Sequence, residues 1–224
     1  MATFVLIPGG GTDPWYWRRL VDELHARGHE PIAVDLPCDD DKAGWVEYAD
    51  AVVAAIGGRT DVVLVAHSLA GFTAPLVADR VPVRLLVLLT AMVPVPGETG
   101  GDWWANTGHA AALAEQAARE GRPAGEDAFA LFTHGMPDDL VAEVLRHDRE
   151  QSGTPFGQPW PLPAWPDVPT RFVLCRDDRF FPAEFVRRVV GERLGVVPDE
   201  IGGGHLAALT HHRELADQLE SYLG

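Results

Sequence analysis

Ser68 lies at the junction of a short apolar strand and a helix, which is where a nucleophilic serine is held in strand–turn–helix enzymes. Residues 62–66 are apolar and mostly β-branched, which predicts a buried strand, and an apolar helical run follows at 73–78. The flanking residues Ala66 and Ala70 are small, as a tight turn requires because strand and helix nearly touch there. The alternative interpretation is an ordinary junction with a serine at the start of a helix.

A nucleophilic serine needs a base and a carboxylate that orients the base. The chain offers candidates in the order serine, acid, base. Asp177 and Asp178 follow a predicted strand over 170–175, and the residues alone do not choose between them. His205 follows three glycines and precedes the closing helix, predicted over 206–223. The glycines allow a loop to carry the imidazole over the ends of the strands.

An acyl-transfer site also needs N–H donors for the oxyanion. The residue after the nucleophile, Leu69, supplies one backbone N–H, and Gly10 in the glycine run 9–11 supplies the other. A phosphate-loop interpretation of this run is weak, because no Lys-Ser/Thr pair follows it. A dinucleotide fingerprint is also weak, since its third glycine would fall at Pro14.

Strands alternate with helices along most of the chain. The pattern predicts strands over 3–7, 31–34, 62–66, 83–89, 170–175 and 196–197. It predicts helices over 15–27, 43–56, from the turn at Ser68 (the elbow) to residue 80, and over 183–194 and 206–223. Near-continuous apolar strands joined by helices indicate a mainly parallel sheet, of about six strands, with helices on both faces. We therefore predict an α/β fold of the doubly wound type.

One interval, residues 93–166, contains no convincing strand. Helical runs are predicted over 110–119, 125–133 and 138–152, and a segment rich in proline and tryptophan follows. We expect this interval to be a helical lid inserted after the fourth strand, with the core formed by 1–92 and 167–224. Lids usually supply apolar walls of the substrate pocket. Some of the aromatic residues in this interval will instead pack the core of the lid itself. The expected pocket residues are Gly9, Gly11, Met92, Trp103, Trp104, Phe129, Phe132, Trp160 and Leu206.

The composition excludes some classes of partner. The chain has 224 residues, 46% of them hydrophobic, which is enough for one sizeable core. With 18 Lys and Arg against 33 Asp and Glu, the net charge of −15 disfavours nucleic acid and anionic membrane surfaces. No apolar run approaches the ~18 residues of a membrane span, and no basic leader precedes the first strand. We expect a cytoplasmic protein.

Four motifs together resemble the α/β-hydrolase superfamily, and more narrowly its small plant-type methylesterase and hydroxynitrile lyase group with bacterial relatives. They are the opening strand and glycine loop over 4–17, the elbow over 65–71, the Asp-x-x-x-Pro segment 178–182, and Gly203-Gly204-His205. The chain departs from the group at Pro8, where a histidine is usual, and at the two alanines of the elbow. The resemblance implies an α/β-hydrolase fold and selects Asp178 over Asp177 as the acid.

The same resemblance separates two chemistries. The lyase branch has a threonine at the position of Gly9 and a lysine at that of Leu206, so hydrolysis is favoured here. We predict a serine hydrolase, a carboxylesterase for small esters with an apolar or aromatic group, with Ser68, Asp178 and His205 as its triad. We expect no metal and no organic cofactor, and a monomer or homodimer. The alternatives are a lactonase, cyclase or lyase with the same pocket, or a non-catalytic small-molecule binding module.

Overall fold

Six parallel strands form the centre of the computed structural model, which describes residues 1–224. The strands are β1 (Thr3–Ile7), β2 (Glu30–Ala33), β3 (Val62–His67), β4 (Leu85–Leu89), β5 (Thr170–Cys175) and β6 (Asp199–Ile201). Their order in the sheet is β2-β1-β3-β4-β5-β6. The predicted α/β architecture, a parallel sheet of about six strands, is therefore confirmed. The chain contains no helix long and apolar enough to cross a membrane.

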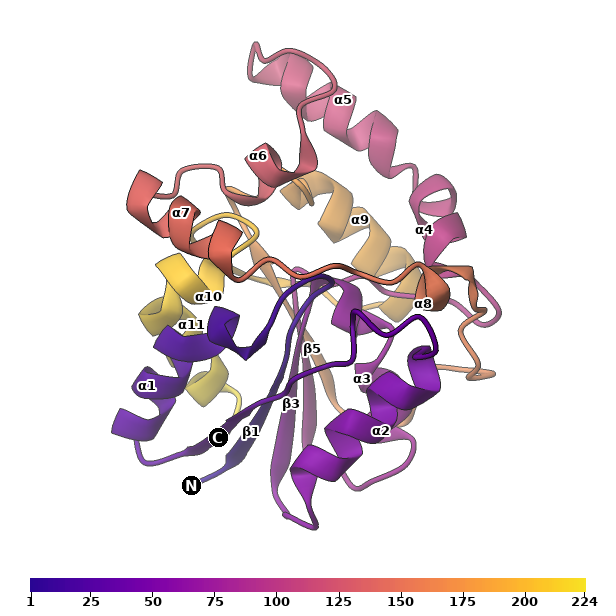
Figure 1. The fold of residues 1–224 in the computed structure, drawn as a ribbon, viewed down its shortest axis with the longest axis vertical. Coiled ribbons are helices and arrows are strands. Elements are labelled where there is room, and N and C mark those ends of the chain that lie inside the picture. Colours follow the sequence, from indigo (N-terminus) through magenta and orange to yellow (C-terminus); the bar gives the residue numbers. More distant parts are fainter.

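Successive residues of each strand serve opposite faces of the sheet, so one run of apolar residues supports two cores. Val5 and Leu64 pack in the core under α2 (Trp45–Ile56), α3 (Ala74–Ala78) and α9 (Ala183–Leu194). Phe4 and Val63 pack in the second core, with α1 (Arg18–Ala26), α10 (Ala207–Thr210) and α11 (His212–Ser221). Figure 1 shows α1 and α11 on one side of the strands and α2 and α3 on the other.

The interval between β4 and β5 is helical, as predicted. It holds α4 (Gly100–Thr107), α5 (His109–Arg119), α6 (Ala128–Phe132), α7 (Asp138–Arg146) and α8 (Thr154–Gly157). These helices arch over one end of the sheet in Figure 1. The sequence interpretation missed α4 and α8. The start of α4 could have been predicted, because threonine is a common residue at the N-terminal cap of a helix. The Thr99 side chain caps α4 by accepting the N–H of Asp102 at 3.0 Å.

Several predicted elements differ from the structure, and three of the differences have a physical reason. The last strand begins at Asp199 and not at 196–197, because Pro198 has no N–H for the ladder and Val197 is 89% exposed. The closing helix is broken at His211 into α10 and α11. The helix predicted over 138–152 ends at Arg146, because residues 148–152 run along the glycine loop instead.

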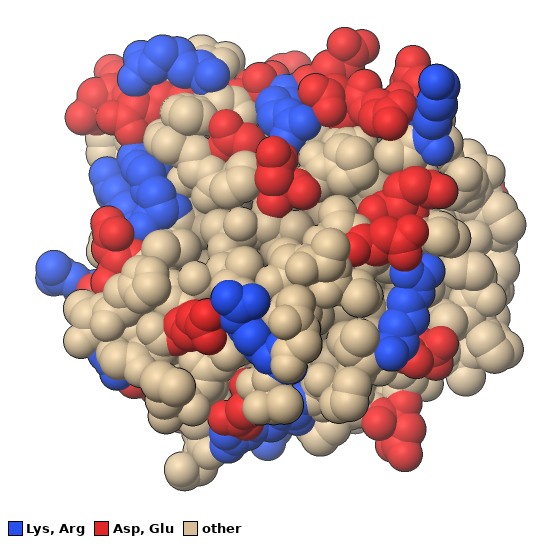
Figure 2. All heavy atoms as spheres, turned by 60° about the horizontal axis from the view of Figure 1, so that its bottom comes forward, with Lys and Arg blue, Asp and Glu red and all other residues tan.

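Charged side chains are mixed over the surface. On the face drawn in Figure 2, acidic groups surround an uncharged area and arginines lie among them. Many are paired, as in the contacts of Arg149 with Asp35 and Asp39 at 2.6 and 2.8 Å. On this face basic and acidic side chains are thus interspersed.

Candidate active site

The carboxyl ends of the strands bring the predicted site residues together. The ladder pairs Ile7 with Ala66, and His67 with Leu89, so β1, β3 and β4 end at the same edge. Cys175 of β5 pairs with Ile201 of β6 at that edge as well. The loops that follow these strands therefore converge, although their residues are far apart in the sequence.

Ser68 occupies a strained elbow. It follows β3 directly and has φ +53°, in the left-handed region that costs an L-residue roughly 1–2 kcal/mol. It begins a 3-10 helix, η2 (Ser68–Gly71), and its carbonyl accepts the N–H of Met92 at 2.9 Å. A Cβ on Gly71 would lie 1.8 Å from the carbonyl oxygen of Met92. The position that must be glycine is thus 71, and alanine is accommodated at 66 and 70.

Two hydrogen bonds connect the serine, the imidazole and the carboxylate. His205 Nε2 lies 3.0 Å from Ser68 Oγ, and His205 Nδ1 lies 2.8 Å from Asp178 Oδ2. Asp178 is fully buried, and its Oδ1 accepts the N–H groups of Phe180 and Phe181 at 2.8 and 2.9 Å. These donors hold the carboxylate in a fixed orientation.

Asp177, the competing carboxylate, lies elsewhere. Its side chain is exposed and accepts the N–H of Gly203 at 3.0 Å, so it supports the loop that carries His205. The geometry therefore places Asp178 beside His205, and Asp177 in a structural position.

Thr90 is a member of this network that the sequence interpretation missed. It follows β4, is fully buried, and donates its hydroxyl to Asp178 Oδ2 at 2.6 Å. Its φ is +38°, which is unusual for a β-branched residue. That unusual conformation aims its hydroxyl at the carboxylate, but backbone angles are not visible in a sequence.

His67 supports the base from below. Its Nε2 lies 2.9 Å from the carbonyl oxygen of His205, which only accepts, so Nε2 carries the proton. The other ring nitrogen, Nδ1, is buried without a partner and lies next to Gly9. Burial lowers the pKa of His67 well below its ordinary value, and the neighbouring His205 adds to the effect. His67 is therefore neutral near pH 7.

The two predicted oxyanion donors lie at the same edge. Gly10 is exposed in the loop after β1, and its N–H donates to no protein acceptor. Leu69 is in the first turn of η2, where N–H groups have no partner inside the helix. Gly9 and Gly11 flank Gly10. A Cβ at Gly9 would lie 2.9 Å from His67 Nδ1 and 3.0 Å from Ser68 Cβ, which explains why this position is glycine.

Aromatic side chains enclose the imidazole. Phe132 of α6 stacks on the His205 ring at 5.0 Å between centroids, and Phe180 and Phe181 meet it edge-on at 5.2 and 5.1 Å. Phe132 and Leu206 also line a cavity of about 180 Å³ between the insertion and the loop of His205. These two expected pocket residues therefore lie beside the base.

For the other expected pocket residues, the structure shows how deeply they are buried and what they pack against. Trp103 and Trp160 are fully buried in the core, and their indole N–H groups donate to the carbonyls of Val93 and Phe72, both within 3.1 Å. Both indoles therefore pack in the core, and their contact with a substrate stays a prediction. Met92 is buried below the elbow, Trp104 is half-buried against Phe180, and Phe129 is half-buried in α6.

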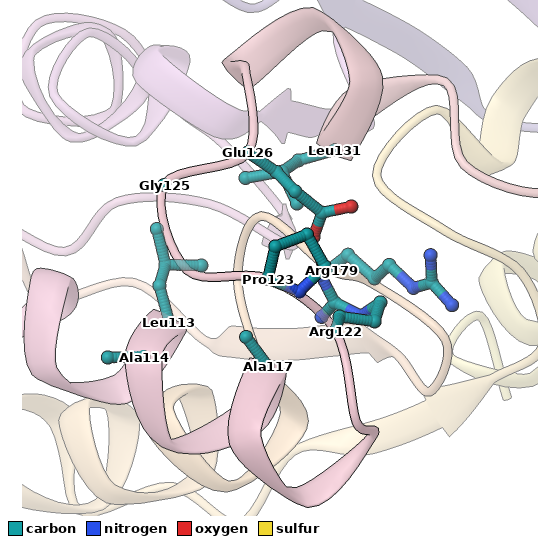
Figure 3. Close-up of a pocket in the computed structure, with 9 residues that line it drawn as sticks. All are labelled: Leu113, Ala114, Ala117, Arg122, Pro123, Gly125, Glu126, Leu131 and Arg179. Carbon is teal, nitrogen blue, oxygen red and sulfur yellow. The ribbon is translucent and has the colours of Figure 1, made fainter.

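The insertion is tied to the acid loop near the triad. Arg179, which follows Asp178, lies 3.3 Å from a carboxylate oxygen of Glu120, and Arg122 contacts the same carboxylate at 2.7 Å. Figure 3 shows Arg179 and Arg122 at a small cavity, with Glu126 pointing toward Arg122 and apolar side chains of α5 and α6 as its wall. His109, at the start of α5, also contacts the Phe180 carbonyl at 2.6 Å through Nε2.

No group of three or more His, Cys, Asp or Glu side chains is placed to hold a metal ion. The hydrogen bonds among the three side chains support transfer of a proton from Ser68 Oγ to His205 Nε2, with Asp178 at the other nitrogen of the imidazole.

Comparison with known proteins decides the family. The model of the alpha/beta hydrolase family matches residues 4–218. The chain belongs to the alpha/beta hydrolase family. Among its relatives, probable esterase PIR7A of rice (Oryza sativa subsp. indica) is 28% identical over 249 residues, which cover 96% of this chain and 94% of the relative.

Solved structures show the same fold as this alpha/beta hydrolase. An extracellular alpha/beta-hydrolase from a Paenibacillus species has a TM-score of 0.80 at 19% identity, with 98% of each chain covered. Polyneuridine aldehyde esterase has a TM-score of 0.75 at 20% identity, with 100% of each chain covered. The comparisons confirm the predicted family, the alpha/beta hydrolases, and the curated relative named above is a probable esterase.

Proposed function

We propose that this alpha/beta hydrolase is a carboxylesterase that cleaves small esters with an apolar or aromatic group, and that Ser68, His205 and Asp178 are its catalytic triad. The observation that carries the proposal is the continuous line of hydrogen bonds from Ser68 Oγ through the imidazole to a fully buried carboxylate, at 3.0 and 2.8 Å.

In the first half-reaction, Ser68 Oγ attacks the ester carbonyl while His205 Nε2 takes the hydroxyl proton. Asp178 stabilises the imidazolium without becoming protonated. The N–H groups of Gly10 and Leu69 bind the oxyanion, and collapse of the intermediate breaks the bond to the alcohol, which leaves with the proton from His205. In the second half-reaction, His205 activates water, which releases the acid and restores Ser68.

The aromatic surroundings of His205 support an apolar substrate. Phe132, Phe180 and Phe181 contact the imidazole, and no cationic side chain touches it. The nearest arginine along the acid loop, Arg179, is paired with Glu120. Esters whose acyl or alcohol part carries a carboxylate would find no partner for that charge there, so we expect neutral esters to be preferred.

The helical insertion acts as a lid in this proposal. It places Phe132 on the imidazole and contacts the acid loop through His109 and Glu120. Substrate reaches Ser68 past these contacts, and they separate the reacting carbonyl from bulk solvent, while one water molecule enters for the second half-reaction. A cytoplasmic location and a monomeric or homodimeric state stay predictions.

An activity-based probe tests the proposal sharply, because the chain has only three serines, Ser68, Ser152 and Ser221. We expect a fluorophosphonate to label Ser68 alone, as shown by mass-spectrometric site mapping. Ser68→Ala should lower p-nitrophenyl acetate turnover by about 10⁴-fold or more. Ser221→Ala, an exposed serine at the end of α11, is the matched control and should keep full activity.

Labelling of another serine, or near-normal turnover by Ser68→Ala, would overturn the triad. A panel of esters and lactones then separates ester hydrolysis from the alternative reactions. Labelling of Ser68 without turnover of any ester on the panel would contradict the carboxylesterase and favour one of those alternatives.

A further inference from the structure

The peptide that supplies the Gly10 N–H has its opposite end held by a side chain. The hydroxyl of Thr12 donates to the carbonyl oxygen of Gly9 at 3.0 Å. That carbonyl and the N–H of Gly10 belong to one trans peptide, so the two groups point in opposite directions. A bond that fixes the carbonyl therefore fixes the direction of the N–H.

The next peptide is held from the insertion. Gly11 N–H, which belongs to the Gly10–Gly11 peptide, donates to Gln151 Oε1 at 3.1 Å, and Gly11 O, in the peptide after it, accepts the N–H of Arg149 at 2.8 Å. Gln151 is itself fixed, since its Nε2 donates to the hydroxyl of Tyr48 at 3.0 Å and to the carbonyl of Ser152 at 2.9 Å. Both peptides on either side of Gly10 thus have an external partner.

These contacts matter because the loop has no stiffness of its own. Three consecutive glycines, 9–11, allow many backbone conformations, of which one presents the donor. Larger residues are excluded here by close contacts, for example of a Cβ on Gly11 with the carbonyl oxygen of Arg149 at 2.9 Å. Order in this loop must therefore come from hydrogen bonds made by residues outside the glycine run.

We infer that Thr12 is a positioning residue of the oxyanion hole, and that Gln151 supports it from the insertion. The inference rests on the proposed function, in which Gly10 N–H binds the oxyanion. Both side chains bond to the backbone of the glycine loop. Each acts by keeping the Gly9–Gly10–Gly11 backbone in the conformation that the transition state needs.

Thr12→Val tests this with almost no change in shape, because only the hydroxyl is lost. We expect kcat for p-nitrophenyl acetate to fall about 10-fold, the effect of one lost hydrogen bond on donor placement, with KM nearly unchanged. The affinity for a trifluoromethyl ketone, which forms a tetrahedral adduct with the serine, should fall by a similar factor. Thr12→Ser restores the hydroxyl and should recover both values. All rates are normalised to sites titrated with a fluorophosphonate.

Thr170→Val is the matched structural control. Thr170 also donates its hydroxyl to a backbone carbonyl, that of Val168 at 3.0 Å, but at the start of β5, at the opposite end of the sheet. This variant should lower the melting temperature without changing kcat per titrated site. Gln151→Met, which leaves Gly11 N–H unpaired, should act in the direction of Thr12→Val and provides a second test where Thr12→Val folds poorly.

The outcomes separate the inference from the proposed function. Equal kcat and equal ketone affinity for Thr12→Val and wild type would overturn the inference. A fall in kcat together with a rise in KM, neither of which Thr12→Ser restores, would overturn it as well. Neither result would contradict the proposed triad, because labelling of Ser68 and the inactivity of Ser68→Ala are measured separately. Failure of those two measurements would overturn the proposed function instead.

Discussion

Replacing Asp178 with asparagine should reverse the tautomer of His205, the proposed base. One oxygen, Oδ1, accepts the N–H groups of Phe180 and Phe181, and the other accepts the Thr90 hydroxyl and faces His205 Nδ1. The amide oxygen of asparagine must take the Oδ1 position, because an NH₂ group there would meet two N–H donors. The NH₂ group of the variant therefore points at His205 Nδ1.

The magnitude follows from that orientation. His205 Nδ1 must then accept a hydrogen bond, so the proton moves to Nε2, which lies 3.0 Å from Ser68 Oγ. An Nε2 that already carries a proton cannot take the one from serine. We expect kcat at pH 7 to fall about 10⁴-fold, the loss seen when a triad carboxylate becomes an amide, which is roughly 5 kcal/mol of transition-state stabilisation.

The assay is p-nitrophenyl acetate turnover at pH 7 together with the rate of fluorophosphonate labelling, and circular dichroism confirms folding. Asp177→Asn is the matched control, since an amide oxygen still accepts the N–H of Gly203 and its activity should stay within about 3-fold of wild type. The reasoning is refuted if Asp178→Asn keeps a tenth of the activity, or if Asp177→Asn loses as much.

Three further predictions test the surroundings of the triad. Thr90→Val removes a buried hydrogen bond to the Asp178 carboxylate and should lower the unfolding free energy by about 2 kcal/mol and kcat about 10-fold, measured by urea unfolding and turnover. Gly9→Ala places a methyl group 3.0 Å from Ser68 Cβ, and displacement of the loop should lower kcat at least roughly 10-fold per titrated site. His67 has a lowered pKa in the folded protein, so below pH ~6.5 the unfolded state binds more protons and the free energy of unfolding decreases as the pH is lowered. Urea unfolding at pH 7, 6 and 5 should show a loss of up to about 1.4 kcal/mol per pH unit. The variant His67→Gln should remove this loss. An unchanged slope in that variant would contradict the last prediction.

The fold and the order of the site were predictable because they depend on local patterns. Apolar runs separated by helical segments predicted the sheet, and parallel strands place their following loops at one edge. Ser68, the acid pair and His205 could each be found from their residue type in a short loop that follows a strand. That argument uses only the position of a residue relative to its own strand, so it needs no knowledge of contacts.

Thr90, Gln151 and the burial of Trp103 were not predictable in the same way. Each depends on contacts between segments distant in sequence, such as Thr90 with Asp178 or Gln151 with Gly11. Such contacts are set by strand register and by the path of the insertion over the sheet. An indole in the insertion, such as that of Trp103, reads equally well as pocket wall or core until its N–H is seen on the Val93 carbonyl.

The two non-glycine residues with positive φ at this edge, Ser68 and Thr90, follow neighbouring strands, β3 and β4. Their hydroxyls contact the two ends of one pair, Ser68 Oγ at His205 Nε2 and Thr90 Oγ1 at Asp178 Oδ2. Each strained residue costs roughly 1–2 kcal/mol, and backbone bonds hold both, from Met92 N–H to Ser68 O and from Thr90 N–H to Val173 O. Because the strain aims both hydroxyls at the imidazole–carboxylate pair, relaxing either backbone would misplace a group that the reaction uses. The strain at Ser68 and Thr90 therefore lowers the stability of this end of the sheet. In return, it holds the two hydroxyls where the proposed triad needs them.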